Sequence, residues 1–274
     1  MNITASQVND LRKITGAGMM DCKKALVEAN GNAEEAIDIL RKKGQKVAAK
    51  RGDNEASEGL IYAKTTGNTG YIIKFNCETD FVAKNADFQK FVNDILEAGI
   101  KSEATSVEEV LKAQFNDKLT VEEKVIEQIG VIGEKLEISG FDKIEAEFVE
   151  AYNHPGNQLA ALVGLNKSSE EAKEAGRQVA MQVAAMNPLS LTKDGIDADT
   201  IARELEVGRD LAIQEGRPVE MADKIAQGRL NKFFKENTLL SQDFVRDNKM
   251  SVEQFLNSVE SGLTVTNFKR LSMS

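Results

Sequence analysis

The sequence has very few of the side chains that most catalytic and metal centres use. Its 274 residues include one His, two Cys and no Trp. A zinc site of the usual kind takes about four His or Cys ligands, and a disulfide scaffold needs more cysteines, so both are excluded. An enzyme of this composition would depend on carboxylates and lysines, with His154 as its single imidazole.

Long apolar runs are also absent. The longest, residues 159–165, is far short of the roughly 18 residues that a membrane span needs. The N-terminus leads directly into an amphipathic pattern, so we expect no targeting segment and no membrane contact. In such a chain Cys22 and Cys77 are expected to be free, buried thiols in a reducing cytoplasm. No G-x-x-x-x-G-K-[ST] motif occurs, which gives no support for a phosphate-binding loop.

Charge is divided unevenly along the chain. Residues 1–51 carry ten basic and six acidic residues, a net charge of +4, whereas the whole chain is −9 and its remainder therefore −13. A basic head on an acidic body is typical of a head that meets an acidic surface. A solvated face on a small helical domain would give the same pattern.

Residues 1–44 are predicted to form three short helices. A capping box at Thr4 and Gln7 begins the first helix, whose inward face includes Val8, Leu11 and Ile14. Glycines at 16 and 18 separate it from the second helix, and Gly44 is expected to end the third. The charged residues 45–56 lack large apolar side chains and are interpreted as a linker.

The centre of the chain changes to a period of two and then repeats a pattern. Strand, turn and strand over 60–77 precede an apolar helix around 88–96, and strands at 148–152 and 158–166 precede a helix from Ser168 to about 187. Another helix runs from Thr120 to about 132, with a strand over 135–149 after it. Hairpin plus helix therefore occurs twice, which indicates two similar units of one α+β domain.

The C-terminal part becomes helical and charged. Two helices joined by Gly216-Arg217-Pro218 predict an antiparallel hairpin, and its narrow apolar stripe predicts that it projects from the body. Ser251 and Gln254 form another capping box, and an alternating run follows at 263–265.

One corner stands out among the residues that could carry a function. Residues 76–84, Asn-Cys-Glu-Thr-Asp-Phe-Val-Ala-Lys, lie where a strand passes into a helix that Thr79 or Asp80 can cap. Phe81 on the first turn is either packed inward or presented to a partner as an anchor. The carboxylate pairs at 34–35, 122–123 and 170–171 all lie in first turns of predicted helices, where they favourably oppose the helix dipole.

Two stretches resemble the signatures of a known family. Residues 11–26, Leu-Arg-Lys-Ile-Thr-Gly-Ala-Gly-Met-Met-Asp-Cys-Lys-Lys-Ala-Leu, are similar to the N-terminal signature of the elongation factor Ts family, guanine-nucleotide exchange factors for the translational GTPase elongation factor Tu. Residues 76–84 are similar to its second signature, and the similarity extends to 151–154 and 239–245. The order and spacing fit the whole chain.

The resemblance implies an α+β fold. A UBA-like three-helix module would occupy residues 1–53, and a core with two subdomains would occupy 54–142 and 143–274. The second subdomain would include a coiled-coil helical hairpin at about 190–236 and a C-terminal module at about 237–274. The family implies a cytoplasmic, non-enzymatic protein that binds elongation factor Tu, with no cofactor, no metal and no direct nucleic-acid contact. Some members of the family form homodimers.

The resemblance also assigns partner contacts. Asp80 and Phe81, flanked by Thr79 and Val82, would intrude near the magnesium and phosphate region of the GTPase. The other contacts fall in three groups: a head surface, a second contact on another domain of the partner, and a C-terminal contact. They comprise Arg12, Met19 and Met20; Ile129, Gly130 and His154; and Val245 and Arg246.

The chain departs from the family pattern at Gln158, at Asp243 and at its C-terminus, which lacks the usual acidic tail. These departures concern the geometry of the second and C-terminal contacts. Two other functions remain open: a hydrolase or transferase that uses Cys77 or carboxylates with His154, and a pure adaptor whose head binds a helix or a ubiquitin-like partner.

Overall fold

The N-terminal head consists of three helices in the computed structural model, which describes residues 3–273. They are α1 (Ala5–Thr15), α2 (Met19–Glu28) and α3 (Ala33–Arg51). The capping box predicted at Thr4 and Gln7 is present. Gly16 ends α1 with a φ of 70°, a left-handed conformation that suits glycine. The three helices bury a small apolar core that includes both Leu11 and Leu26.

The prediction that Gly44 ends the third helix, with a linker over 45–56, is wrong. Helix α3 continues through Gly44 to Arg51, and Val47 and Ala48 pack against the core of the next unit. The glycine serves a close helix crossing instead, because a Cβ at Gly44 would lie 2.9 Å from the carbonyl oxygen of Ile126. Small residues at a crossing let two backbones approach, and such a glycine costs a helix only about 1 kcal/mol.

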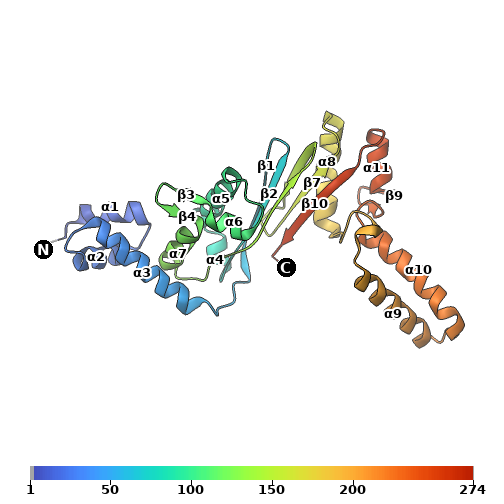
Figure 1. Cartoon of the computed structure of the whole chain (residues 1–274), viewed down its shortest axis with the longest axis horizontal. Coiled ribbons are helices and arrows are strands. Elements are labelled where there is room, and N and C mark those ends of the chain that lie inside the picture. The colour runs from blue at the N-terminus through green and yellow to red at the C-terminus, as the bar shows by residue number, and fades with distance from the viewer. Residues whose placement is uncertain (1–2, 274) are drawn as a thin grey trace.

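The first half of the core is a three-stranded antiparallel sheet in the order β1-β2-β5, with helices on its outer face (Figure 1). The predicted hairpin over 60–77 is confirmed by β1 and β2. Phe75 of the sheet meets Phe88 and Phe91 of the covering helix edge to face. The elements are β1 (Glu58–Thr66), β2 (Thr69–Cys77), α4 (Asp80–Ala83), α5 (Ala86–Lys101), α6 (Val107–Lys112), β3 (Gln114–Asn116), β4 (Leu119–Thr120), α7 (Val121–Ile132) and β5 (Glu137–Glu145).

The second half has a sheet in the order β10-β7-β6, with α8 and α11 packed on its outer face. The strands predicted at 148–152 and 158–166 and the helix after them are confirmed. The single strand predicted over 135–149 is instead divided between the two sheets, since β5 ends at Glu145 and β6 begins at Phe148. The elements are β6 (Phe148–Asn153), β7 (Leu159–Leu165), α8 (Glu170–Met186), β8 (Asp243–Phe244), β9 (Asp247–Ser251), α11 (Val252–Val259) and β10 (Val265–Ser272).

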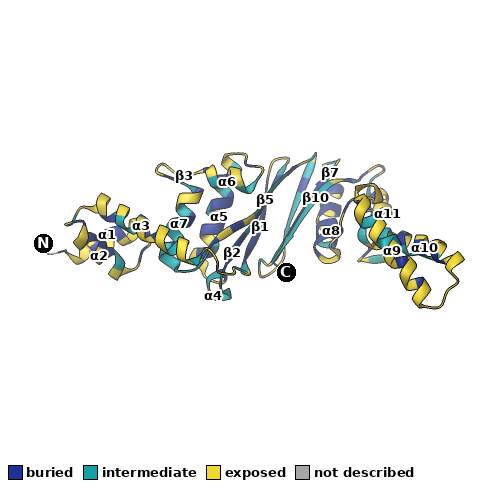
Figure 2. Ribbon diagram, turned by 60° about the horizontal axis from the view of Figure 1, so that its bottom comes forward, coloured by how far each residue is buried: buried dark blue, intermediate teal, exposed yellow. Residues whose placement is uncertain are grey.

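The two sheets pack against each other through their inner faces. Ile61 and Ile72 of the first sheet meet Val149 and Leu162 of the second in one buried cluster. The core therefore has four layers, helix, sheet, sheet and helix, which agrees with the α+β class and gives the repeated hairpin-plus-helix pattern a structural counterpart. Figure 2 shows the buried residues concentrated along these layers.

The predicted helical hairpin is also confirmed. After a short 3₁₀ turn, Lys193–Gly195, helices α9 (Ala198–Gln214) and α10 (Val219–Asn237) run antiparallel and project from the body at the end opposite the head (Figure 1). Their interface is narrow because it is built from small residues such as Gly208, Ala212 and Ala226. None of the helices among residues 3–273 has the length and apolar character needed to cross a membrane.

Candidate functional site

The corner after β2 presents one aromatic side chain to solvent. Thr79 caps the single-turn helix α4, its hydroxyl accepting a 3.4 Å hydrogen bond from the Val82 amide. Phe81 is 82% exposed, whereas Val82 packs against the core and Ala83 is buried. Of the two orientations that the sequence left open for Phe81, the structure therefore shows the outward one.

The carboxylate of Glu134 holds the start of α4 from a loop 55 residues further along the chain. Its Oε2 accepts hydrogen bonds from the backbone amides of Glu78 and Thr79, at 3.1 and 3.0 Å. Its Oε1 accepts a third from the Thr79 hydroxyl at 2.6 Å. One side chain thus satisfies three donors at the point where the strand becomes a helix.

The carboxylate of Glu78 makes the reverse connection. It accepts a 2.5 Å hydrogen bond from the Lys135 amide, and its two oxygens accept from Nη1 of Arg51 at 3.0 and 2.8 Å. Asn54 adds a fourth hydrogen bond at 3.1 Å. The Lys135 amide is the main cause that lowers the pKa of Glu78, and Arg51 and Asn54 lower it further. Because Arg51 ends α3, this cluster links the head directly to the base of α4.

The side chains beneath and beside Phe81 are fixed and unreactive. The Cys77 thiol is fully buried and donates to the Thr79 carbonyl at 3.2 Å. Burial, reinforced by the nearby Glu134 charge, raises the pKa of Cys77 to about 12. Asp80 pairs with Lys84 at 2.6 Å, and that hydrogen bond lowers the pKa of Asp80. Asp80 is therefore ionised at neutral pH, while Cys77 remains a protonated thiol.

A groove of about 630 Å³ separates Phe81 from the corner between α1 and α2. Gly16 lies on the head side and Phe81 on the core side, with Phe91 and Phe115 among the lining residues, their rings 6.0 Å apart. The structure therefore brings the two halves of the resemblance, the signatures at 11–26 and 76–84, to the same groove.

The head presents a largely apolar surface next to this groove. Met19 and Met20 at the start of α2 are exposed, and so is Arg12 on α1. The prediction that Ile14 faces inward is wrong, because Ile14 is 64% exposed. Thr15 takes the inward position instead, with its hydroxyl donating to the Leu11 carbonyl at 2.9 Å. Ile14 thereby adds a further exposed apolar side chain to the head.

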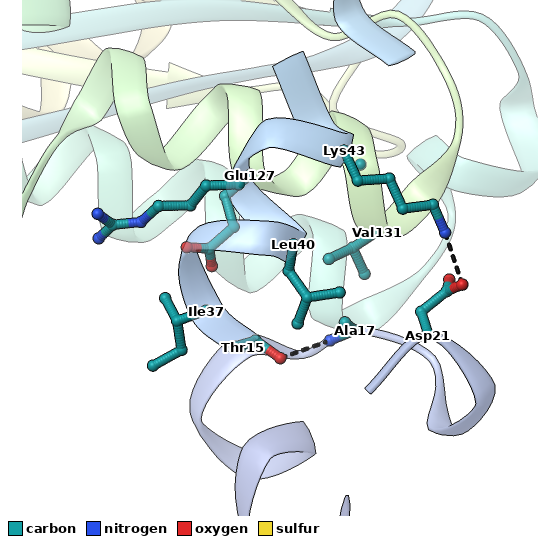
Figure 3. Close-up of a pocket in the computed structure, with 10 residues that line it drawn as sticks. Thr15, Ala17, Asp21, Ile37, Leu40, Lys43, Glu127 and Val131 are labelled. Atoms are coloured by element: carbon teal, nitrogen blue, oxygen red, sulfur yellow. Dashed lines mark hydrogen bonds and ion pairs between the residues drawn. The ribbon is translucent and has the colours of Figure 1, made fainter. Parts of the chain in front are cut away.

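The joint between head and core is a small pocket where α3, α7 and the α1–α2 loop meet. Figure 3 shows Leu40 and Val131 facing each other there, with the 2.6 Å ion pair of Lys43 and Asp21 at one side. The Thr15 hydroxyl accepts a 3.2 Å hydrogen bond from the Ala17 amide within the loop. The joint therefore combines apolar packing with polar contacts that order the loop.

Two of the predicted contact residues lie in packed surroundings rather than on an open surface: Ile129 in the apolar core of the first sheet and Gly130 in the joint. Ile129 is only 7% exposed, and a Cβ at Gly130 would lie 2.7 Å from the Cα of Gly44. The structure does not bring them together with His154, which lies in the turn between β6 and β7 with Nδ1 2.9 Å from the Tyr152 hydroxyl. Their part in a partner contact stays a prediction, and the structure gives Gly130 a packing role.

The predicted C-terminal contact lies far from the head. Val245 and Arg246 are exposed in the turn between β8 and β9, at the opposite end of the molecule from α1 and α2 (Figure 1). The Val245 amide donates to Gln182, a fully buried side chain of α8, at 2.9 Å. At the departure from the family pattern, Asp243 pairs with Lys235 at 2.9 Å.

Sequence reasoning missed two residues of the site, Ile132 and Glu134. Ile132 lines the groove with Phe81, and Glu134 anchors Thr79. The available signal was Gly133, which ends α7 with a φ of 81° and turns the chain toward the corner. An Ile-Gly pair at 132–133 follows the pair at 129–130, and of these four residues only Ile132 lines the groove.

Among residues 3–273 no group of three or more His, Cys, Asp and Glu side chains could hold a metal ion. With Cys77 buried and protonated, the arrangement suits recognition by shape.

Comparison with known proteins agrees with the resemblance. A family model described as "Elongation factor TS" matches residues 78–274. The chain is 52% identical to "Elongation factor Ts" of Christiangramia forsetii over 273 residues, which cover 99% of this chain and 98% of that protein. It is 49% identical to the protein of the same name from Flavobacterium psychrophilum, with the same coverage, and 43% identical to that of Clostridium kluyveri over 98% of this chain and 92% of the relative. The chain belongs to the elongation factor Ts family.

Proposed function

We propose that this protein accelerates GDP release from the translational GTPase elongation factor Tu and thereby allows GTP to bind. The observation that carries the proposal is the 82% exposed Phe81 on a one-turn helix whose base is held by two carboxylates. Phe81 is the most exposed large apolar side chain that the structure describes, and it stands beside a groove on a fixed support, as an aromatic anchor for a partner would.

In this mechanism Phe81 wedges between elements of the GTPase that position the magnesium ion and the nucleotide phosphates, with Thr79 and Val82 as its flanks. Magnesium requires near-octahedral geometry, so a small displacement of its ligands removes much of the affinity for the nucleotide. Asp80, ionised beside Phe81, brings negative charge toward the phosphate region. The coupling is reciprocal: the factor binds the nucleotide-free GTPase best, and rebinding nucleotide expels it.

The remaining contacts would hold the wedge in place. The apolar head surface with Arg12, Met19 and Met20 contacts the GTPase on the other side of the groove. The further contacts that we propose are His154 in the β6–β7 turn, Ile129 and Gly130 on α7, and Val245 with Arg246 at the far end. No catalytic residue, cofactor or nucleic acid takes part, and the protein acts in the cytoplasm. A homodimer remains compatible with this function.

The two alternatives differ in what they require. A hydrolase or transferase that uses Cys77 as nucleophile requires an accessible thiolate, whereas this thiol is buried with a pKa of about 12. A pure adaptor would bind elongation factor Tu without changing the rate of GDP release.

Release of a fluorescent GDP analogue from elongation factor Tu, followed by stopped flow with increasing amounts of the full-length protein, tests the proposal. The release rate should rise with concentration to a plateau. Binding without acceleration would leave the adaptor as the function, and absence of binding would refute both.

A further inference from the structure

Helix α4 is too short to hold its own orientation. It contains four residues, and isolated helices of fewer than about 12 residues are marginal in water. The direction in which Phe81 points is therefore set by contacts from outside α4.

Besides the packing of Val82 and Ala83 against the core, Glu134 supplies three hydrogen bonds at the start of α4. It accepts from two consecutive amides, those of Glu78 and Thr79, and from the Thr79 hydroxyl. Because that hydroxyl donates to Glu134, its lone pairs remain free to accept from the Val82 amide and cap α4. Glu134 thus fixes both the backbone entering the helix and the rotamer of its cap.

Glu134 is itself held by its neighbours. It follows Gly133, whose amide donates to the Ile129 carbonyl at 2.9 Å, and precedes Lys135, whose amide donates to Glu78. The chain segments around residues 78 and 134 are therefore clamped to each other in both directions. Charged hydrogen bonds to backbone amides are among the stronger ones in proteins, which makes this a stiff connection.

We propose that Glu134 is a positioning residue for nucleotide exchange: it holds α4 so that Phe81 points in one direction, and it acts only through Phe81. The inference rests on the proposed exchange function. It assigns Glu134 no contact with the GTPase and no part in chemistry.

The test is a double-mutant comparison of Glu134→Ala and Phe81→Ala in the GDP-release assay, with Glu137→Ala as the matched control. The Glu137 carboxylate lies three residues further on, 3.6 Å from the Lys135 ammonium, and its side chain is half exposed. Glu134→Ala should lower the plateau release rate about tenfold, because a displacement of about 1 Å at a contact group can lower a rate by this factor or a larger one. The protein concentration at half-plateau should change less than twofold, and Glu137→Ala should behave as the wild type.

The decisive comparison is made in the Phe81→Ala background, where Glu134→Ala should lower the rate by less than twofold further. An equal loss in both backgrounds, or a wild-type plateau in folded Glu134→Ala, overturns the proposal. Should Glu134→Ala fail to fold, Thr79→Val decides: at nearly constant shape it removes the hydroxyl that donates to Glu134 and accepts from the Val82 amide, and it should also lower the plateau. A wild-type plateau for Thr79→Val would then overturn the proposal.

These results are distinguishable from failure of the proposed function. A wild-type protein that does not accelerate GDP release removes the function and this inference together. Acceleration that depends on Phe81 but not on Glu134 removes only the inference. Hydrogen exchange of the amides at 79–82 in the free protein gives an independent readout, and it should be faster in Glu134→Ala than in Glu137→Ala.

Discussion

Phe81→Ala is the most direct test of how this protein would act on a GTPase. The substitution removes an aromatic ring that is 82% exposed and contributes little to the fold. Surface changes of this kind alter the free energy of unfolding by about 0.5 kcal/mol or less. The variant should therefore fold and melt as the wild type does, and any change in exchange belongs to the contact with the partner.

The size of the effect follows from the exposed area. Complete burial of a Phe side chain is worth about 1.5–3 kcal/mol. Because 82% of Phe81 is available for burial, the wedge contributes about 1.2–2.5 kcal/mol if the partner covers it fully. If that energy is realised only as the nucleotide site opens, its loss lowers the plateau release rate roughly 8- to 70-fold.

The assay is stopped-flow release of a fluorescent GDP analogue at saturating concentrations of each variant, so that weaker binding does not imitate slower exchange. Phe81→Leu should keep most of the activity because it retains an apolar wedge. Val219→Ala, at a 60% exposed apolar position on the tip of the helical hairpin, is the control. A plateau for Phe81→Ala within twofold of the wild type would show that Phe81 is not the wedge.

Three further predictions concern the support of the site. Glu78→Gln should lower the melting temperature more at pH 6 than at pH 3. A carboxyl group with a lowered folded-state pKa contributes its full stability above the ordinary value of 4.5 and loses it as the pH falls through the folded-state pKa. An equal deficit at both pH values contradicts this. At pH 8 a thiol reagent should label no cysteine of the native protein and two cysteines of the unfolded protein, because Cys22 and Cys77 are fully buried in the fold. At a pKa of about 12, only roughly one Cys77 thiol in ten thousand is ionised. Fast labelling of the folded protein would refute this prediction. Gly130→Ala should destabilise the protein by about 1–3 kcal/mol in urea unfolding, because the new Cβ would lie 2.7 Å from the Gly44 Cα. Gly228→Ala on α10 is the control: a Cβ there would have no atom within 4 Å, so the change should be neutral or stabilising. Equal effects of the two changes would show that the crossing tolerates the methyl group.

Features set by near neighbours in the chain could be predicted. The capping boxes predicted at Thr4 and Ser251 are present, because each depends on residues only three positions apart. The hairpins followed from the period-two pattern and their turns. The carboxylate pairs at 34–35, 122–123 and 170–171 lie in the first turns of α3, α7 and α8 as predicted, because the start of a helix is also marked by residues close together in the sequence.

Features set by distant neighbours could not be predicted. Gly44 has the same local sequence whether it ends a helix or meets Gly130, and only the position of α7 decides between them. Strand β10 pairs with β7 across about a hundred residues, a register that the short alternating run did not specify. Glu134 reaches Thr79 across 55 residues, so its role depends on where Gly133 directs the chain.

The rigidity of the site bears on how the head and Phe81 would work together. Helix α3 is fixed at two points, by the Gly44 crossing on α7 and by the Arg51–Glu78 ion pair at the base of α4. The two sides of the groove are therefore set at a defined separation before a partner arrives. Ordering a loop on binding costs about 1–2 kcal/mol per residue of backbone, and a prearranged α4 avoids that cost. On the proposed function, the binding energy gathered by the head is then available to drive Phe81 into the GTPase. Loosening either fixed point should accordingly reduce exchange more than it reduces binding.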